Sequence, residues 1–400
     1  MKPPEREKQR ISLRVSITFL LIVLAIIAGF LYSAERGQPM EQPKATLPAP
    51  PTFTNAEEEH LYRFLALHMT DPYGGTYTNL QPSAADEVQG NTATGHAVLS
   101  ESVGLLMEYA VLSNNLALFD LQTHLLQQRF IQKDFIRWVV PSQGTAPAPN
   151  VNAALDDLRI IGALLSGANT FHQPHAHQLA LQLAQSLRAH NEKQGYLLDY
   201  ASADRTTLAP SVQVRYLDLA TLAKLQQLDP AYIPIYQHGA NLYRQALQPS
   251  GLYATAYLPD KQAFQQENNR TAVTPNMSEQ LVAALHAQAA DLPTDGMRNL
   301  LKRTLTSRGR LFATVTYEGS PATTVESPAV YALAARFLQR AGEDDFAKRC
   351  LSRLRDFQVP PPHQYQGGFV DLKSLTAFSF DQLQALLALR EADPADPADR

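Results

Sequence analysis

The sequence predicts an all-α protein: a toroid of helical hairpins, written (α/α)6, that follows one N-terminal transmembrane helix. Three observations support this prediction. Apolar residues recur with the helical period from Asn55 almost to the C-terminus. The joints between successive helices alternate between short and long, and the long ones resemble one another, which indicates a repeat of roughly 45–60 residues. An uncharged apolar run near the N-terminus is long enough to cross a membrane.

The composition places the chain among globular proteins and excludes several classes of function. Of the 400 residues, 45% are hydrophobic and 18% are charged. The formal net charge is −4 and no long basic block occurs, so nucleic acid is not expected as a partner. Cys350 is the single cysteine, which excludes an intrachain disulfide and a cysteine-ligated zinc site. Glycine-rich cofactor motifs are missing from the sequence, and we expect no cofactor.

The apolar run covers residues 15–32, VSITFLLIVLAIIAGFLY, and predicts a single-pass anchor in the cell membrane. Basic residues are concentrated in 1–14, so this tail is expected in the cytoplasm and the rest of the chain outside. A cleaved signal peptide is the alternative. Cleavage after Ala34 would place Tyr32 third before the cut, where a small residue is preferred. Residues 33–54, rich in proline, predict a spacer, and residues 393–400 a disordered tail.

The domain is expected to span residues 55–392 and to contain about twelve helices. Their approximate ranges are 55–69, 101–113, 116–131, 152–166, 174–190, 212–227, 230–247, 277–289, 294–307, 327–341, 344–356 and 379–391. Short joints such as 114–115 and 342–343 form antiparallel pairs, whereas long joints carry glycine and aromatic residues. About six such pairs fit a closed toroid, and a linear solenoid of helix pairs is the alternative.

Acidic residues recur at the starts of alternate helices, which share one face of the domain in either arrangement. Ser100 is expected to cap one helix, which places Glu101 in its first turn. The other residues at such starts are Asp156, Asp157, Tyr216, Asp218, Ser278, Glu279, Glu326 and Asp381. The helix macrodipole is sufficient to explain any one of these acids. As a set, they predict a cleft in which two carboxyl groups flank a glycosidic bond.

Aromatic residues in the adjoining loops support a sugar-binding cleft, because their faces can stack on pyranose rings. These residues are Tyr73, Tyr77, Trp138, Tyr196, Tyr253, Tyr257 and Tyr317. Arg159 and Arg215 lie near the acids in sequence, and we expect them to pair with these carboxylates. The histidines of HQPHAH, His172, His175 and His177, fall on the short-joint side and are interpreted as a solvated helix start without a metal.

The segment SESVGLLMEYAV, from Ser100 to Val111, resembles the first motif of glycoside hydrolase family 8, approximately S-E-G-Q-G-Y-G-M-x-x-A-V. Six positions match: Ser100, Glu101, Gly104, Met107, Ala110 and Val111. The segment around Asp157 resembles the second motif, A-S-D-A-D-x-x-I-A-x-A-L, through Ala154, Asp157, Ile160, Ala163 and Leu164. Weaker likenesses at 209–212 and 365–389 extend the resemblance over roughly residues 60–392.

This resemblance implies an (α/α)6 barrel of the inverting endoglycosidases. It implies that Glu101 is the general acid and that Asp157, with Asp156 beside it, binds the sugar at the cleavage subsite. The family's general base is an aspartate in Y-D-A-x-R, whereas this chain has PNMSEQL at 275–281. Glu279 and Asp218 therefore both remain candidates for the base. Tyr216, Trp138 and Tyr253 are the expected substrate-binding aromatics.

The sequence as a whole predicts a membrane-anchored, extracytoplasmic glycoside hydrolase that acts on an exopolysaccharide or another β-linked glucan. A polysaccharide lyase or sugar epimerase on the same fold is one alternative; it would use Tyr, His or Arg to abstract a proton beside a uronate. An inactive toroid that binds polysaccharide next to the exopolysaccharide synthesis machinery is the other, and the missing Y-D-A segment favours it.

Overall fold

The computed structural model describes residues 47–83, 87–89, 92–142, 149–265 and 274–392, all of them in one unit. The expected anchor, residues 15–32, lies outside these ranges. Within them, no helix combines the length and apolar character that crossing a membrane requires. Part of the expected spacer belongs to the helical domain. Leu47 is buried, and the carbonyl oxygen of Pro48 accepts hydrogen bonds from Tyr62 and Asn115.

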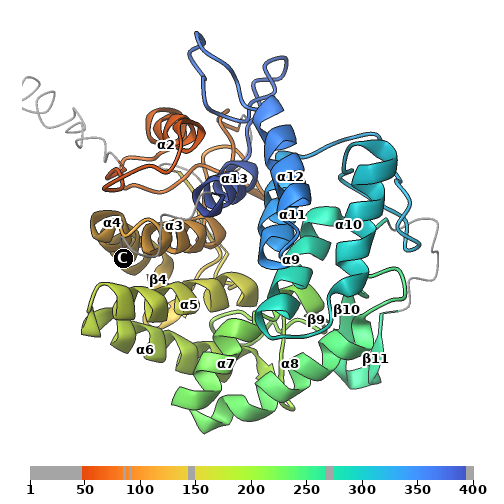
Figure 1. Cartoon of the computed structure of the whole chain (residues 1–400). Coiled ribbons are helices and arrows are strands. Elements are labelled where there is room, and N and C mark those ends of the chain that lie inside the picture. Colours follow the sequence, from red (N-terminus) through yellow and green to blue (C-terminus); the bar gives the residue numbers. More distant parts are fainter. Residues whose placement is uncertain (1–46, 84–86, 90–91, 143–148, 266–273, 393–400) are drawn as a thin grey trace, which may run out of the picture. The chain divides into compact units, whose positions relative to one another are not determined.

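Two concentric sets of helices make up the domain (Figure 1). Apart from the short helix α7, the inner helices are buried on most sides, whereas the outer helices bury one stripe. The inner set is α3 (Ser100–Leu112), α5 (Ala154–Thr170), α7 (Leu219–Leu228), α9 (Met277–Ala289), α11 (Pro328–Arg340) and α13 (Ser379–Glu391). The outer set is α2 (Ala56–His68), α4 (Leu116–Leu125), α6 (Pro174–Asn191), α8 (Ile233–Ala246), α10 (Asp295–Arg308) and α12 (Asp344–Asp356).

The inner helices form a closed ring. Each packs against the next in sequence order, and α13 packs back against α3. The last helix also contacts α2, so the first and last described helices lie side by side (Figure 1). This closure confirms the helical toroid and makes the linear solenoid wrong.

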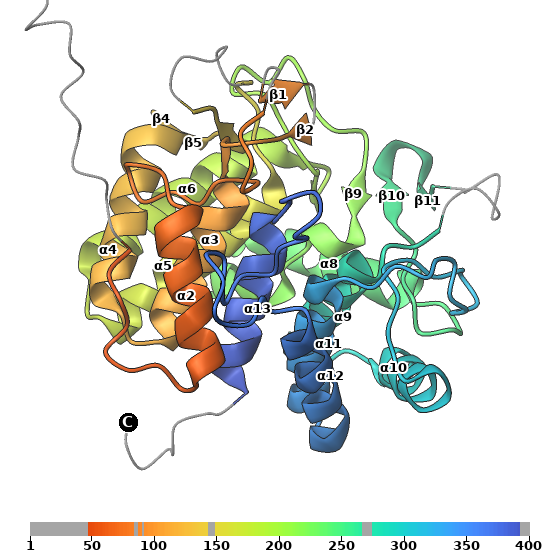
Figure 2. The same ribbon diagram turned by 90° about the horizontal axis from the view of Figure 1, so that it is seen from above.

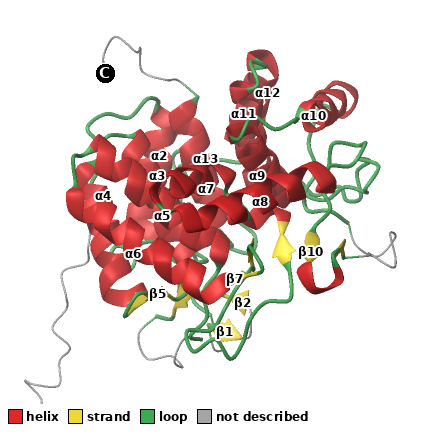
Figure 3. Cartoon of the chain, turned by 90° about the horizontal axis from the view of Figure 1, so that it is seen from below, coloured by secondary structure: helices red, strands yellow, loops and turns green. Residues whose placement is uncertain are grey.

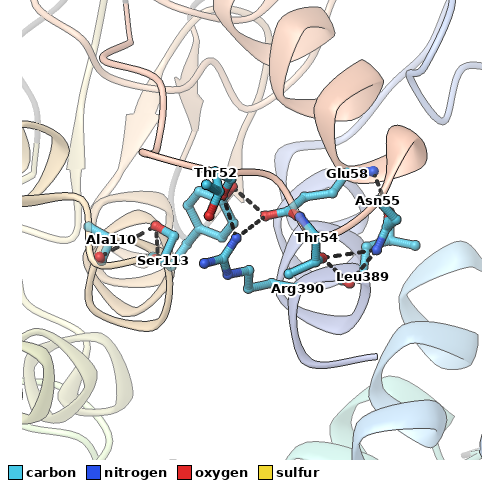
Figure 4. Close-up of polar contacts among 9 residues, drawn as sticks. Thr52, Thr54, Asn55, Glu58, Ala110, Ser113, Leu389 and Arg390 are labelled. Atoms are coloured by element: carbon cyan, nitrogen blue, oxygen red, sulfur yellow. Dashed lines mark hydrogen bonds and ion pairs between the residues drawn. The ribbon is translucent and has the colours of Figure 1, made fainter. Parts of the chain in front are cut away.

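The buried carboxylate of Glu58 joins the two ends of the ring (Figure 4). It accepts hydrogen bonds from the backbone nitrogen and the hydroxyl of Thr54, at 2.7 and 2.8 Å, and from the Tyr109 hydroxyl at 2.6 Å. Arg390, at the end of α13, lies 3.4 Å from the same carboxylate. Because α2, α3 and α13 all contribute, this network fixes where the ring closes.

Short strands and long loops gather on one face of the ring (Figure 2 and Figure 3). Their bounds are β1 (Val88–Gln89), β2 (Thr92–Ala93), β3 (Val98–Leu99), β4 (Ile131–Gln132), β5 (Phe135–Ile136), β6 (Val139–Val140), β7 (Glu192–Lys193), β8 (Tyr196–Leu197), β9 (Val212–Gln213), β10 (Ala256–Leu258) and β11 (Ala263–Phe264). β3 pairs with β6, and β9 pairs with β10, all antiparallel. These ladders tie successive long loops together, so that the inner helices start on the same face.

Two helix starts differ from the sequence prediction. Ser100 is the first residue of α3 and makes no capping bond, because its hydroxyl turns toward α5 instead. The helix expected at 212–227 begins only at Leu219. Val212 pairs with Tyr257 in a strand, and Val214–Tyr216 form one 3-10 turn. Asp218 caps α7 by accepting from the backbone nitrogens of Ala220 and Thr221, and these bonds set the start of that helix.

Candidate active site

The first turns of α3 and α5 meet at the long-loop face and bring two acids together. The Ser100 hydroxyl, which is fully buried, donates to Asp156 Oδ2 at 3.1 Å. It also lies 3.1 Å from the carbonyl oxygen of Trp138, so a loop residue is fixed at the same point. Arg159 Nη1 contacts the other oxygen of Asp156 at 3.1 Å. Glu101 follows Ser100 directly and shares this environment.

Glu101 differs from its neighbours because, within the described part of the chain, no protein group hydrogen-bonds to its carboxyl. Burial, together with the negative charge of Asp156, raises the pKa of Glu101 to about 7, against the opposing effect of Arg159 and Arg215. A carboxyl group that holds its proton near neutrality and has no internal partner can donate that proton to a bound ligand. This is the chemical requirement for a general acid.

Near Glu101, the 3-10 turn before α7 and the first turn of α9 supply charged and aromatic groups. Arg215 Nη2 lies 3.3 Å from Glu279 Oε1, and the Arg215 guanidinium stacks 4.7 Å above the Tyr216 ring. Burial raises the pKa of Tyr216 to about 12, and the charges of Asp156, Asp199 and Glu101 add to this increase. Tyr216 and Glu279 thus lie at the same end of the ring as Glu101.

Asp218 and Asp157 are held by protein groups. Both oxygens of Asp218 are engaged, since Oδ2 accepts from the Thr221 hydroxyl at 2.6 Å while Oδ1 caps α7. Asp157 is 3% exposed, and its Oδ2 accepts from Asn152 at 2.7 Å. Burial raises the pKa of Asp157 well above its usual value. In this arrangement Asp156, rather than Asp157, is the aspartate of α5 that lies beside Glu101.

The two expected loop aromatics have different positions. Trp138 is half-buried, and its peptide group bonds to Ser100 and Val151, which places it at the start of α3. Tyr253 is 2% exposed, and its ring packs edge-on against Tyr243 at 5.6 Å. The prediction that Tyr253 offers a stacking face does not agree with this burial. The loop carrying Tyr253 is held by the Gln280 side chain of α9, so the aromatic belongs to the core.

Two further acids at helix starts serve the scaffold. Glu326, before α11, binds Arg353 of α12 at 2.9 Å and contacts the Tyr331 hydroxyl. Asp381, in the first turn of α13, accepts from the Ser327 hydroxyl and from the backbone nitrogen of Ala329. The predicted ring of acids therefore reduces to a smaller cluster around Glu101, Asp156 and Glu279.

Solved structures share this architecture over nearly their whole length. A structure named a novel alpha-amylase from Clostridium perfringens matches with a TM-score of 0.76 at 26% identity, covering 84% of this chain and 97% of that one. PssZ from Listeria monocytogenes has a TM-score of 0.64 at 21% identity, covering 87% and 98%. Endoglucanase Cel10, a family 8 glycosyl hydrolase from Klebsiella pneumoniae, has a TM-score of 0.57 at 14% identity, covering 85% and 99%. The chain has the six-hairpin glycosidase fold.

Sequence comparison finds a relative of this chain. The protein named "Putative lipoprotein YdaJ" from Bacillus subtilis (strain 168) is 28% identical over 297 residues, which are 73% of this chain and 79% of that protein. A search with protein-family models finds no match. The motif likeness and the solved structures therefore point to a divergent member of the six-hairpin group.

The six-hairpin fold also positions an acid that the sequence prediction missed. Asp199 follows β8 and is 2% exposed; it accepts hydrogen bonds from the Ser211 hydroxyl and the Gln213 backbone nitrogen. Burial raises the pKa of Asp199 to about 6. Because Gln213 Oε1 in turn receives Arg215 Nε at 3.0 Å, Asp199 supports the loop that carries Arg215. Asp199 lies near the end of GYLLDY, one of the repeated long joints rich in glycine and aromatic residues. That repeat is the sequence signal that could have identified Asp199.

A cavity of about 270 Å³ lies along the axis of the six-hairpin ring. Its walls include Glu108 and Leu112 of α3, Arg336 of α11 and Glu391 of α13, which belong to the later turns of the inner helices. Asp218 at the start of α7 also lines the cavity, and Arg159 both forms part of its wall and contacts Asp156. Within the described ranges, no three His, Cys, Asp or Glu side chains are placed to hold a metal ion.

Proposed function

We propose that this protein is a glycoside hydrolase that cleaves a polysaccharide, with Glu101 as its general acid. The observation that carries the proposal is the half-buried Glu101 carboxyl, which has a raised pKa and no hydrogen-bond partner in the described chain, beside the ionisable Asp156. Environments that separate the proton affinities of neighbouring carboxyl groups are typical of acid–base catalysis.

In this mechanism Glu101 donates its proton to the glycosidic oxygen as the bond to the anomeric carbon breaks. A water molecule attacks the opposite face of the sugar, and a second carboxylate accepts the proton that the water loses. Glu279 is the better candidate for this base, because its side chain is 39% exposed and Arg215 gives it a cationic partner. Both oxygens of Asp218 are already engaged in capping α7. Inversion would require roughly 6.5–9.5 Å between the two carboxyl groups.

The substrate is proposed to be an extracytoplasmic polysaccharide, and the protein to be held at the cell membrane by residues 15–32. The apolar run supports the anchor, and a relative named as a lipoprotein supports a surface location. Asp156, Tyr216 and Trp138 are proposed to bind the sugar, because each lies at the start of α3, α5 or α7. Among the matched structures, one is named an alpha-amylase and others endoglucanases. Both α-linked and β-linked glucans must therefore be tested as substrates.

The test measures products from a panel of α- and β-linked glucans, xylan and exopolysaccharide from the source cells. We expect new reducing ends with at least one polymer and at least about a 100-fold loss of rate in Glu101→Gln. Glu326→Gln is the matched control, because it removes a carboxylate at another inner-helix start that is bound to Arg353. Full turnover by Glu101→Gln would refute the proposed acid.

An inactive polysaccharide-binding toroid is the second candidate, since the Y-D-A-x-R segment that carries the base in glycoside hydrolase family 8 is replaced here by PNMSEQL at 275–281. It predicts saturable binding of a polymer by wild type and Glu101→Gln alike, with no reducing ends from either. Products with an unsaturated chromophore would instead indicate a lyase.

A further inference from the structure

Arg159 contacts both Asp156, at the start of α5, and the axial cavity. It lies in the first turns of α5, is 9% exposed, and contacts Asp156 Oδ1 at 3.1 Å toward the long-loop face. On its other side it forms part of the wall of the axial cavity, together with Glu108. A guanidinium buried between two carboxylates can fix the orientation of both.

Gly104 provides the space that Arg159 needs to reach Asp156. A Cβ atom at Gly104 would lie 3.0 Å from Arg159 Cδ and 3.1 Å from Cγ, closer than ordinary contact. The stem of Arg159 therefore packs directly on the backbone of α3, less than one turn from Glu101. The glycine also matches the glycoside hydrolase motif, so its small size has a specific structural use here.

The charged groups around Arg159 come from every inner helix near it. On α3 and α5 these are Glu101, Glu108, Asp156 and Asp157. Before and on α7 and α9 they are Arg215, Asp218, Lys224, Glu279 and His286. On α11 and α13 they are Arg336, Arg340 and Glu391. Arg336 is neutralised by Glu391 at 2.9 Å, and Arg215 by Glu279 at 3.3 Å. Arg159 is thus the cation that directly contacts Asp156 beside Glu101.

We propose that Arg159 is a positioning residue that holds the Asp156 carboxylate against the first turn of α3 and so sets the pH range in which Glu101 keeps its proton. This inference rests on the proposed function. Without the guanidinium, the positive charge that favours ionisation of both carboxyls is lost, and both hold protons more tightly. While Asp156 stays ionised, Glu101 titrates at higher pH, and the alkaline limb of the rate profile moves with it.

The test follows the titration of Glu101 itself in the full chain, labelled with ¹³C at the glutamate carboxyl carbons. The Glu101 signal is assigned by its loss in Glu101→Gln. In Arg159→Gln we expect the midpoint to rise by about one pH unit. Arg340→Gln is the matched control: it removes one guanidinium from the same cavity wall, bound to Glu391 at 2.9 Å, and should leave the midpoint unchanged.

Gly104→Ala provides a second, gentler variant if Arg159→Gln does not fold. It keeps every charge but forces the Arg159 stem outward by a few tenths of an ångström, so the midpoint should move in the same direction by a smaller amount. An unchanged Glu101 midpoint in the folded variant would overturn the role of Arg159. If the midpoint shifts but no polymer is cleaved by any variant, the positioning role stands and the hydrolase proposal fails.

Discussion

Ser100 Oγ donates a hydrogen bond to Asp156 Oδ2 at 3.1 Å, joining the first turns of α3 and α5 directly beside Glu101. The two residues are 56 positions apart in the chain. The bond exists because Ser100 begins the helix instead of capping it, which leaves its hydroxyl free to reach the neighbouring helix. The same geometry makes the acid pair sensitive to small changes in α3.

Replacing Ser100 by alanine should destabilise the protein by about 1–3 kcal/mol, because Asp156 loses a buried donor. The pKa of Asp156, already raised by burial, should rise further, since the Ser100 bond lowers it. Ser102→Ala is the control. Its hydroxyl is buried and, among the described residues, has no hydrogen-bond partner, so this change should be neutral or stabilising. Urea unfolding measures the free energy of unfolding of both variants. Equal losses of stability would contradict the hydrogen bond between Ser100 and Asp156.

Glu101→Gln should stabilise the folded protein above neutral pH. The folded-state pKa of Glu101 is about 7, against about 4.5 when unfolded, so wild type loses stability as pH rises from the lower value through the higher one. At pH 8 the variant should be more stable by up to about 3 kcal/mol, and at pH 4 the two should be equal. Thermal unfolding at both pH values checks this; a difference that is constant with pH would refute the raised pKa.

The same titration determines the rate profile of the proposed hydrolase. Because Glu101 acts in its protonated form, kcat/KM should fall as pH rises through about 7. Initial rates across the pH range provide the measurement. An alkaline limb near the ordinary pKa of a glutamate would show that another group is the acid.

The two base candidates should respond differently to loss of charge. Glu279→Ala should reduce kcat by at least about 100-fold, with partial recovery in azide or formate, because a small anion can occupy the vacated space and replace the missing base. Asp218→Asn should retain most turnover, since asparagine is also a good N-cap, and should cost about 1 kcal/mol of stability or less. The reverse pattern would assign the base to Asp218.

The Glu58 network should control the stability of the closed ring. Glu58→Gln places amide hydrogens against the donors of Thr54 and Tyr109, and we expect a loss of about 3–5 kcal/mol in urea unfolding. Glu59→Gln is the control on the same helix turn, because its pair with Arg63 is solvent-exposed. That change should stay within about 0.5 kcal/mol. Similar effects of the two substitutions would contradict the proposed closure.

Local chemistry let the sequence predict much of the fold. The helical period and the alternating joints identified each inner and outer helix, because a residue's side-chain direction in a helix depends only on its neighbours in the chain. The boundary of α7 was missed because Val212 finds a strand partner, Tyr257, 45 residues away, and no local pattern announces that pairing. Likewise, Glu326 and Asp381 resemble Glu101 in sequence but bind Arg353 and Ser327.

By itself, the sequence determined that the chain forms antiparallel helix pairs with acids at alternate helix starts, because periodicity, capping and breaker residues act over a few positions. Only the tertiary structure decided that α13 returns to α3, that Tyr253 is buried, and that Asp156 rather than Asp157 lies beside Glu101. Those outcomes depend on which groups meet across the ring. Burial and charge at such meetings, which raise the pKa of Glu101 and engage both oxygens of Asp218, are properties of the assembled packing.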